Sequence, residues 1–221
     1  MNSPGEIARG LAARSLEADD PTGWFEKLYS AAGTGDMVVP WHQGGPDPML
    51  VGWAAGRSGT GSRAIVVGCG LGDDAEFVAG LGYDTLAFDV APSAVDQARQ
   101  RFPGSTVDYH PADLLALPGE WRHAFDLVVE NFTVQSLPES VRSIATGAVA
   151  GLVAPGGTLI VHASVRRDDA PPRTGPPWPL RRAEVEAFAA DGLAAHSIEE
   201  VPEPDDPSYT VWQAEFGRRP A

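Results

Sequence analysis

Short apolar runs alternate with amphipathic stretches over residues 63–217, and this alternation predicts the fold. Five runs are nearly continuously apolar, as strands buried on both faces of a sheet require, and they lie at 64–68, 85–90, 106–110, 125–131 and 158–165. Helical patterns follow at 73–80, 92–102, 137–153 and 181–192, and two further strand patterns at 193–201 and 209–216. Strands that alternate with helices form βαβ units with right-handed crossovers. The sequence therefore predicts an α/β fold with a doubly wound, mostly parallel sheet.

The first 56 residues differ from this core. Residues 1–20 are polar, acidic and rich in alanine, and we interpret them as a flexible N-terminal tail. Residues 21–56 concentrate aromatic side chains around the glycine- and proline-rich stretch PWHQGGPDP. We predict one domain over residues 21–221, in which this segment precedes a core at 63–217.

Composition narrows the functional classes. The chain has 16 basic and 30 acidic residues, a net charge of −14, which argues against a surface for nucleic acid or anionic membrane. The single cysteine, Cys69, forms no internal disulfide, and no histidine or cysteine cluster has metal-ligand spacing. No apolar run reaches about 18 residues and no export signal is visible. We expect a cytoplasmic monomer or homodimer that acts on a small molecule without a metal.

The segment AIVVGCGLGDD carries the most chemical information, because it joins a strand to a helix through Gly68, Gly70 and Gly72. Glycines are needed where a chain turns sharply and where a ligand approaches bare backbone. Asp89 ends the second strand 21 residues after Gly68, near the spacing at which a carboxylate meets ribose hydroxyls. After the third strand, Asp113 is placed to accept from an adenine amino group or, equally, to cap a helix. A tight turn without a ligand is the alternative interpretation of the glycines.

The residues after the turn indicate which nucleotide is bound. A dinucleotide places its pyrophosphate at the helix N-terminus, where this chain has Asp73 and Asp74. Two carboxylates repel a pyrophosphate, so an NAD-dependent oxidoreductase is the weaker hypothesis. S-adenosylmethionine carries ribose and adenine, no phosphate, and a positive sulfonium, and it is the cofactor that we predict.

With these motifs the sequence resembles the class I S-adenosylmethionine-dependent methyltransferases over residues 22–216. A narrower similarity is to the thiopurine and thiol/halide methyltransferase branch, carried by GCGLGDD with Asp74 and by GWFEKLY and PWHQGGPDP. The resemblance implies a Rossmann-like sheet of seven strands with an antiparallel last strand and helices on both faces. It also implies that residues 21–56 form a lid, in which Trp24 and Trp41 cover the cofactor. The chain departs from many class I enzymes at Val66, where an acidic residue is common.

The carboxyl end of the fourth strand supplies the remaining candidates, because open α/β sheets bind ligands at that edge. The expected cofactor contacts are Trp24, Trp41, Gly68, Cys69, Gly70, Gly72, Asp74, Asp89, Val90, Ala112, Asp113, Leu114, Glu130, Asn131 and Phe132. The expected acceptor contacts are Phe132, Gln135, Arg173 and Trp178, and the candidate catalytic residues are His42, Glu130 and Gln135.

We expect methyl transfer to a small molecule, with a thiol as the first candidate, because a thiol is partly ionised near neutral pH and hardly needs a base. Methylation of oxygen or nitrogen in a small metabolite, and a non-catalytic module that only binds S-adenosylmethionine, are the alternatives.

Overall fold

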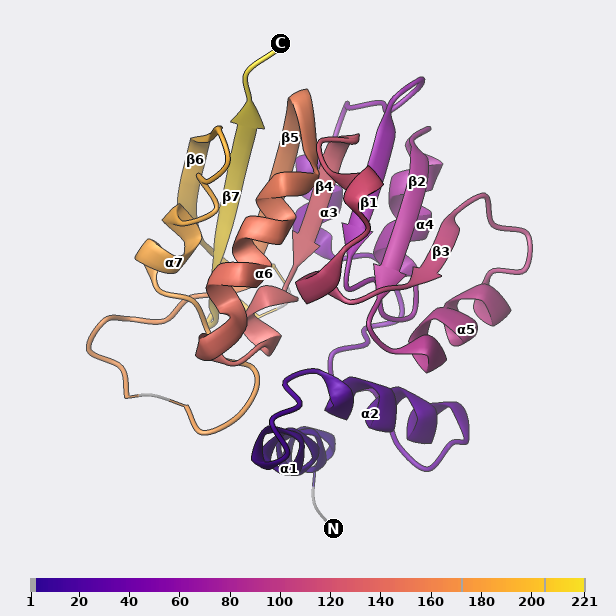
Figure 1. Ribbon diagram of the computed structural model, residues 1–221, viewed down its shortest axis with the longest axis vertical. Helices are drawn as coiled ribbons and strands as arrows, with labels where there is room; N and C mark the ends of the chain where they lie inside the picture. Colours follow the sequence, from indigo (N-terminus) through magenta and orange to yellow (C-terminus); the bar gives the residue numbers. More distant parts are fainter. Residues whose placement is uncertain (1–2, 172, 205, 221) are drawn as a thin grey trace.

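The computed structural model describes residues 3–171, 173–204 and 206–220, and its centre is a seven-stranded sheet of order β3-β2-β1-β4-β5-β7-β6 (Figure 1). The strands are β1 (Arg63–Val67), β2 (Asp84–Asp89), β3 (Asp108–Pro111), β4 (Phe125–Asn131), β5 (Val153–Ser164), β6 (Leu193–Pro202) and β7 (Thr210–Arg218). β1 to β5 pair in parallel, whereas β7 runs antiparallel to both of its neighbours. The predicted fold class is confirmed, including the antiparallel last strand.

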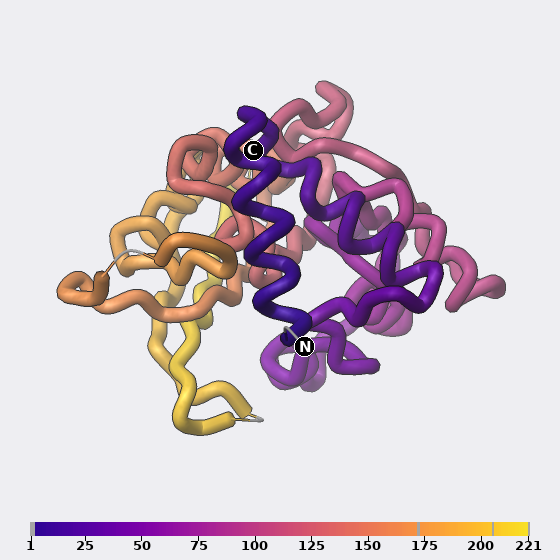
Figure 2. The backbone as a smooth tube through the Cα atoms, turned by 90° about the horizontal axis from the view of Figure 1, so that it is seen from below, coloured from indigo at the N-terminus to yellow at the C-terminus, as the bar shows by residue number. Residues whose placement is uncertain are grey.

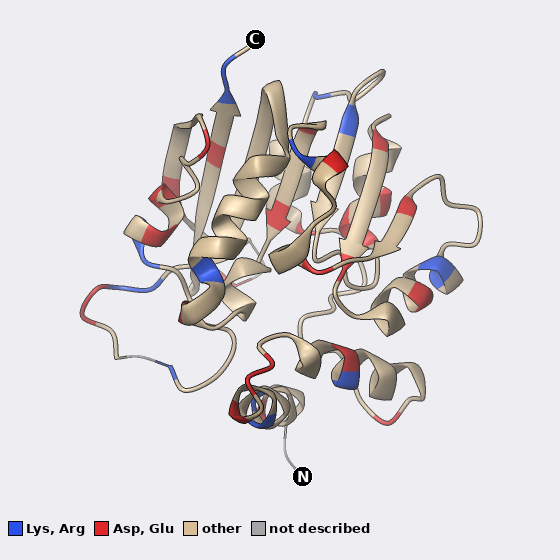
Figure 3. Cartoon of the chain, viewed as in Figure 1, with Lys and Arg blue, Asp and Glu red and all other residues tan. Residues whose placement is uncertain are grey.

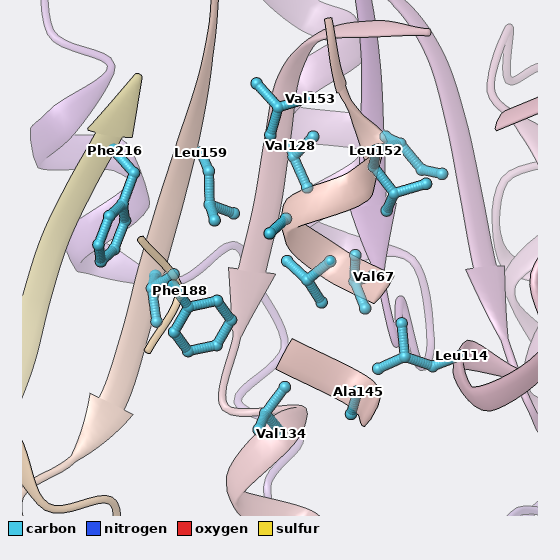
Figure 4. Packing of buried hydrophobic residues seen from close by; sticks show 14 of the residues in the cluster. Val67, Leu114, Val128, Val134, Ala145, Leu152, Val153, Leu159, Phe188 and Phe216 are labelled. Carbon is cyan, nitrogen blue, oxygen red and sulfur yellow. The ribbon is translucent and has the colours of Figure 1, made fainter. Parts of the chain in front are cut away.

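Helices cover both faces of the sheet (Figure 1). On one face lie α3 (Pro48–Trp53), α4 (Asp73–Gly80) and α5 (Pro92–Arg101), and on the other α6 (Glu139–Leu152) and α7 (Arg182–Glu186). Because side chains alternate along a strand, each strand feeds both layers. Val128 packs in the α6 layer, as Figure 4 shows, while its neighbours Leu127 and Val129 pack in the α3–α5 layer.

Two helices at the N-terminus lie against the lower edge of the sheet, α1 (Pro4–Glu17) and α2 (Gly23–Gly33) (Figures 1 and 2). This differs from the flexible tail that we predicted for residues 1–20, of which residues 1 and 2 lie outside the described residues. α1 begins with a capping box, in which the Ser3 hydroxyl accepts from the Glu6 N–H and the Glu6 carboxylate accepts from the Ser3 N–H. Ala8 and Ala12 are buried in a cluster with Trp24 of α2. The helix is therefore both capped and packed.

Shorter elements complete the chain. Three 3-10 turns follow strands β3 and β4, namely η1 (Leu114–Ala116), η2 (Gly119–Trp121) and η3 (Val134–Ser136). The helix predicted at 181–192 is regular only in α7, and the strand predicted from 158 begins earlier, at Val153, which pairs with Phe125 before a register shift. Among the described residues, no helix is long and apolar enough to cross a bilayer.

Candidate functional site

A cavity of about 520 Å³ lies between the carboxyl ends of the parallel strands and the helices α1 and α2. Figure 3 shows acidic positions gathered along this lower edge of the sheet. Fifteen of the predicted site residues line the cavity: Trp24, Trp41, His42, Gly68, Cys69, Gly70, Asp74, Asp89, Val90, Ala112, Asp113, Leu114, Asn131, Phe132 and Gln135. The other four, Gly72, Glu130, Arg173 and Trp178, are not part of its wall.

In the loop between β1 and α4, two glycines stand where a side chain has no room. Gly68 has φ +62°, and a Cβ there would lie 2.5 Å from Oγ1 of Thr133. Gly70 has φ +51°, and a Cβ there would lie 2.8 Å from the Tyr29 hydroxyl. A side chain at either position is disfavoured by its backbone and collides with the cavity wall. The loop therefore presents bare backbone to the cavity.

Gly72 has a different role from the predicted cofactor contact. It precedes α4 with φ +93°, and a Cβ there would lie 2.5 Å from the Tyr109 hydroxyl and 3.2 Å from Cβ of Ala98. The position is glycine because α4 packs tightly on β3 and α5. This is the packing function that the last glycine of such a turn commonly has.

Asp89 lies at the end of β2 beside the glycine loop. Its carboxylate accepts from the N–H of Gly70 at 3.0 Å and from the N–H of Ala91 at 2.9 Å. Burial raises the pKa of this carboxyl to about 6, although the backbone N–H groups oppose the increase. A carboxylate accepts about four hydrogen bonds, so Asp89 keeps capacity for two hydroxyl donors.

Aromatic rings form the side of the cavity that faces α2. Trp24 stacks on Phe25 with centroids 3.9 Å apart, and Trp41 meets Trp24 edge to face at 6.0 Å. Nε1 of Trp41 donates to the hydroxyl of the buried Tyr29 at 3.1 Å. Trp41 is itself 45% exposed, while Nε1 of Trp24 is buried and has no partner among the described residues. The wall thus combines ring faces with one unpaired N–H donor.

A chain of hydrogen bonds links the segment before α3 to the sheet. The Asp74 carboxylate accepts from the Asp47 N–H and from Nδ2 of Asn131, both at 2.8 Å. Oδ1 of Asn131 contacts Nδ1 of His162 at 2.7 Å. Burial lowers the pKa of His162 to about 4, so the imidazole is neutral at pH 7 and its Nδ1–H donates to Asn131. Asp74 therefore fixes both the segment before α3 and the amide at the end of β4.

Glu130 and Phe132 are the neighbours of Asn131 in the chain, and only Phe132 lines the cavity. The fully buried Glu130 accepts through Oε1 from the N–H groups of Thr133 and Val134, both at 2.8 Å, and thereby holds the η3 turn. Because Glu130 points to the α6 face, the prediction that it contacts cofactor or acceptor is not supported by its position. Phe132 lines the cavity with φ +56°, an uncommon conformation for a bulky residue.

The loop before α7 reaches the cavity through residues other than those we predicted. Arg173 is exposed, and the Trp178 indole donates to the Arg173 carbonyl oxygen, so these two residues contact each other outside the wall. Pro176 and Pro177 line the cavity instead.

The polar wall residues absent from our predictions include Asp47, Ser164 and Tyr209. They belong to a helix cap, to the end of β5 and to the turn before β7. The buried end of β5 was visible in the sequence, whereas only the folded chain brings Tyr209 to it.

The remaining predicted contacts lie around the rim. Nδ1 of His42 is 3.4 Å from the Asp73 carboxylate, which Arg101 also binds through two nitrogens at 2.8 and 2.9 Å. Asp113 accepts from the Leu115 N–H through one oxygen, so it caps η1 while it faces the cavity. Both interpretations weighed for Asp113 are compatible with this geometry.

The cavity fits an adenosine compound that lacks phosphate. Asp74 projects into it beside the helix N-terminus, where a pyrophosphate would bind, and Arg9 is the one Lys or Arg among the described residues of the wall. The unpaired Trp24 N–H, the free capacity of Asp89 and the bare glycine loop are suited to a ligand with ring nitrogens and hydroxyls.

Comparison with known proteins indicates which enzyme activity the cavity serves. Residues 64–157, from β1 into β5, match the family model of a methyltransferase domain. The protein is an S-adenosylmethionine-dependent methyltransferase.

The relatives of this methyltransferase differ in their named acceptors. It is 27% identical to thiocyanate methyltransferase 1 of Brassica oleracea, over 90% of this chain and 84% of that protein. It is 34% identical to a ubiquinone biosynthesis O-methyltransferase of Xanthomonas campestris, over 52% of this chain and 48% of that protein. The fold resembles that of 1,6-didemethyltoxoflavin-N1-methyltransferase of Burkholderia thailandensis, solved with S-adenosylhomocysteine, at 15% identity, a TM-score of 0.64 and coverage of 99% and 92% of the two chains.

Proposed function

We propose that the enzyme transfers the methyl group of S-adenosylmethionine to a sulfur atom of a small molecule. The observation that carries this proposal is the state of the two imidazoles nearest the cavity. His162 is fully buried and its Nδ1 is bonded to Asn131, and His42, whose Nδ1 lies 3.4 Å from Asp73, is the one imidazole among the described wall residues. A hydroxyl acceptor needs a strong base, whereas a thiol is partly ionised near neutral pH. The name of the Brassica relative, a thiocyanate methyltransferase, supports the same choice, because thiocyanate contains sulfur.

The cofactor supplies an electrophilic methyl group on a positive sulfonium. In our proposal, Asp89 binds the ribose hydroxyls, Asp113 accepts from the adenine amino group, and Asn131 binds the amino-acid end of the cofactor. The faces of Trp24 and Trp41 attract the positive charge, an interaction of about 0.5 to 2 kcal/mol.

The wall of the cavity then acts by alignment. With the cofactor bound, the acceptor sulfur would gain the methyl carbon as the sulfonium loses it, and the thiol proton would pass to solvent. Holding the reacting atoms in line is worth an effective molarity on the order of 10⁵ M or more. Phe132, in its left-handed conformation, places a rigid ring at the end of β4 where the methyl group is expected.

A matched acceptor panel tests the sulfur assignment. Release of S-adenosylhomocysteine is measured with thiophenol, phenol and aniline, which share one ring and differ in the nucleophilic atom. We expect turnover of thiophenol with a rate that follows the thiolate fraction as pH rises. Turnover of phenol or aniline alone would contradict the proposal.

Methylation of a hydroxyl is the second candidate, because one carboxylate in the wall has the properties of a base. Burial raises the pKa of Asp47 to about 6, and its Oδ1 caps α3 by accepting from Met49 and Leu50. Asp47→Asn retains the capping oxygen and removes the base. Loss of phenol methylation with retained thiophenol methylation would assign the base to the oxygen reaction.

A further inference from the structure

Beyond the end of β4 the cavity extends to three polar side chains, Gln135 in η3, Ser164 at the end of β5 and Tyr209 before β7. We call them the polar end of the cavity. Pro176 and Pro177 line the same region.

Gln135 has an unpaired donor. The residue is 5% exposed, and its Oε1 accepts from the backbone N–H of Ser164 at 2.6 Å. Only the amide oxygen can accept that bond, so the orientation of the amide is fixed. Within residues 3–171, 173–204 and 206–220, Nε2 donates to no protein acceptor, and it is not among the fully buried unpaired atoms, so it is open to the cavity that the residue lines. An amide donor that faces a cavity can donate to an acceptor group on a ligand once the ligand has displaced solvent.

The surrounding bonds hold this donor in place. The carbonyl oxygen of Gln135 accepts from the Trp178 N–H at 2.7 Å, which ties η3 to the proline-rich loop. The Tyr209 hydroxyl donates to Oγ of Ser164, so the Ser164 hydroxyl keeps its own proton to donate. The polar end thus offers two donors, Nε2–H of Gln135 and Oγ–H of Ser164.

The charge around the cavity selects among ligands for these donors. Asp47, Asp74 and Glu203 lie in the wall, and Arg9 is the one Lys or Arg among its described residues. Carboxylates in a partly buried cavity repel a small anion. Two hydrogen-bond donors in a negative cavity suit a neutral oxygen or ring nitrogen.

We propose that the polar end binds a neutral organic acceptor molecule through a carbonyl oxygen or comparable group next to the nucleophilic atom, in preference to an inorganic anion. The inference rests on the proposed function for the identity of that atom, and it departs from the acceptor named for the Brassica relative.

Paired acceptors test this recognition in the 221-residue enzyme with S-adenosylmethionine. 2-Mercaptoacetamide and 1-propanethiol have similar size and differ in the carboxamide group, and thiocyanate and iodide represent anions. Because the carboxamide also makes the thiol more acidic, kcat/KM is compared per thiolate. We expect this value for 2-mercaptoacetamide to exceed that for 1-propanethiol by about tenfold, with both anions below them. Equal values for the two thiols, or a preference for either anion, would overturn the inference.

Two variants assign the effect to the polar end. Gln135→Glu keeps an oxygen for the Ser164 N–H and replaces the donating nitrogen, and Tyr209→Phe frees the Ser164 hydroxyl to turn away. Both are expected to reduce the preference for the carbonyl compound by about threefold to tenfold, with unchanged affinity for S-adenosylhomocysteine. Tyr83→Phe, in a turn that is not part of the cavity wall, is the matched control and should keep the wild-type ratio.

Failure of the inference is separable from failure of the sulfur proposal. Glycolamide and 1-propanol, and glycinamide and propylamine, are measured in the same way. A carbonyl preference in one of these pairs without thiol turnover refutes the sulfur assignment and supports the polar end. If no compound turns over, affinities of the S-adenosylhomocysteine complex for the two thiols decide, and equal affinities overturn the inference.

Discussion

Replacing Glu130 by glutamine is expected to change how the free energy of unfolding depends on pH while methyl transfer is retained. Burial raises the pKa of Glu130 from 4.5 to about 7, although two backbone N–H groups oppose the increase. Its Oε2 is buried and has no partner among the described residues. Gln keeps the oxygen that accepts from Thr133 and Val134 and cannot ionise.

The expected magnitude follows from the two pKa values. The folded protein holds the Glu130 proton more tightly than the unfolded chain, so this contribution to stability is complete below pH 4.5 and is lost as the pH rises through about 7. Between pH 5 and pH 8 the wild type therefore loses about 2 to 3 kcal/mol that the variant does not lose.

Urea unfolding of both proteins at several pH values measures this difference. Asp47 and Asp89, whose pKa values are also raised by burial, are present in both proteins and cancel. The free energy of unfolding of Glu130→Gln relative to wild type should rise by about 2 to 3 kcal/mol from pH 5 to pH 8. A difference in the free energy of unfolding that stays constant with pH would show that the pKa of Glu130 is not raised in the folded protein. A hundredfold loss of kcat at unchanged cofactor affinity would instead place Glu130 in the chemistry.

Substitutions at Gly68, Phe132 and Trp41 test three further predictions. Gly68→Ala should lower the free energy of unfolding by about 3 kcal/mol or more in urea titration, because the methyl group meets Thr133, whereas Gly156→Ala, at φ +80° with open space, should cost about 1 kcal/mol; equal losses would count against the collision. At Phe132 the usual order should reverse, with Phe132→Gly more stable than Phe132→Ala by about 1 kcal/mol in thermal unfolding, because of the positive φ; the normal order would argue against that conformation. Trp41→Leu should lower the affinity for S-adenosylmethionine by about 2- to 30-fold in calorimetry and lower that for S-adenosylhomocysteine less. Equal losses of affinity for the two compounds would exclude attraction between the ring and the sulfonium.

Elements whose pattern is local were predictable from the sequence. The strand at 125–131 and the helix at 73–80 have the predicted bounds, because a continuously apolar run and an acidic helix start after glycine are set by neighbouring residues. The capping box of Ser3 and Glu6 is an equally local signal for α1. Our prediction of a flexible tail used the polar composition of residues 1–20 and missed this signal.

Side-chain direction and distant contacts account for the errors at the site. Because side chains alternate along β4, Glu130 lies on the same face as Val128, and Asn131 lies on the other face. The alternation of the strand therefore contradicted our expectation that both polar residues face the ligand. No sequence pattern links Tyr209 to Ser164, 45 residues away, because their contact depends on the insertion of β7 beside β5.

Calorimetric titration of the wild type and of Asp89→Asn with S-adenosylhomocysteine and with NAD tests the central claim most directly. The Gly70 N–H donates to Oδ2 of Asp89 and the Ala91 N–H to Oδ1, so the single oxygen of Asn keeps one of these bonds and the variant loses an acceptor atom for the ribose. We expect the wild type to bind S-adenosylhomocysteine and not NAD, and the folded variant to bind it at least about tenfold more weakly. Unchanged affinity in Asp89→Asn, or binding of NAD by the wild type, would contradict a phosphate-free adenosine site anchored by Asp89.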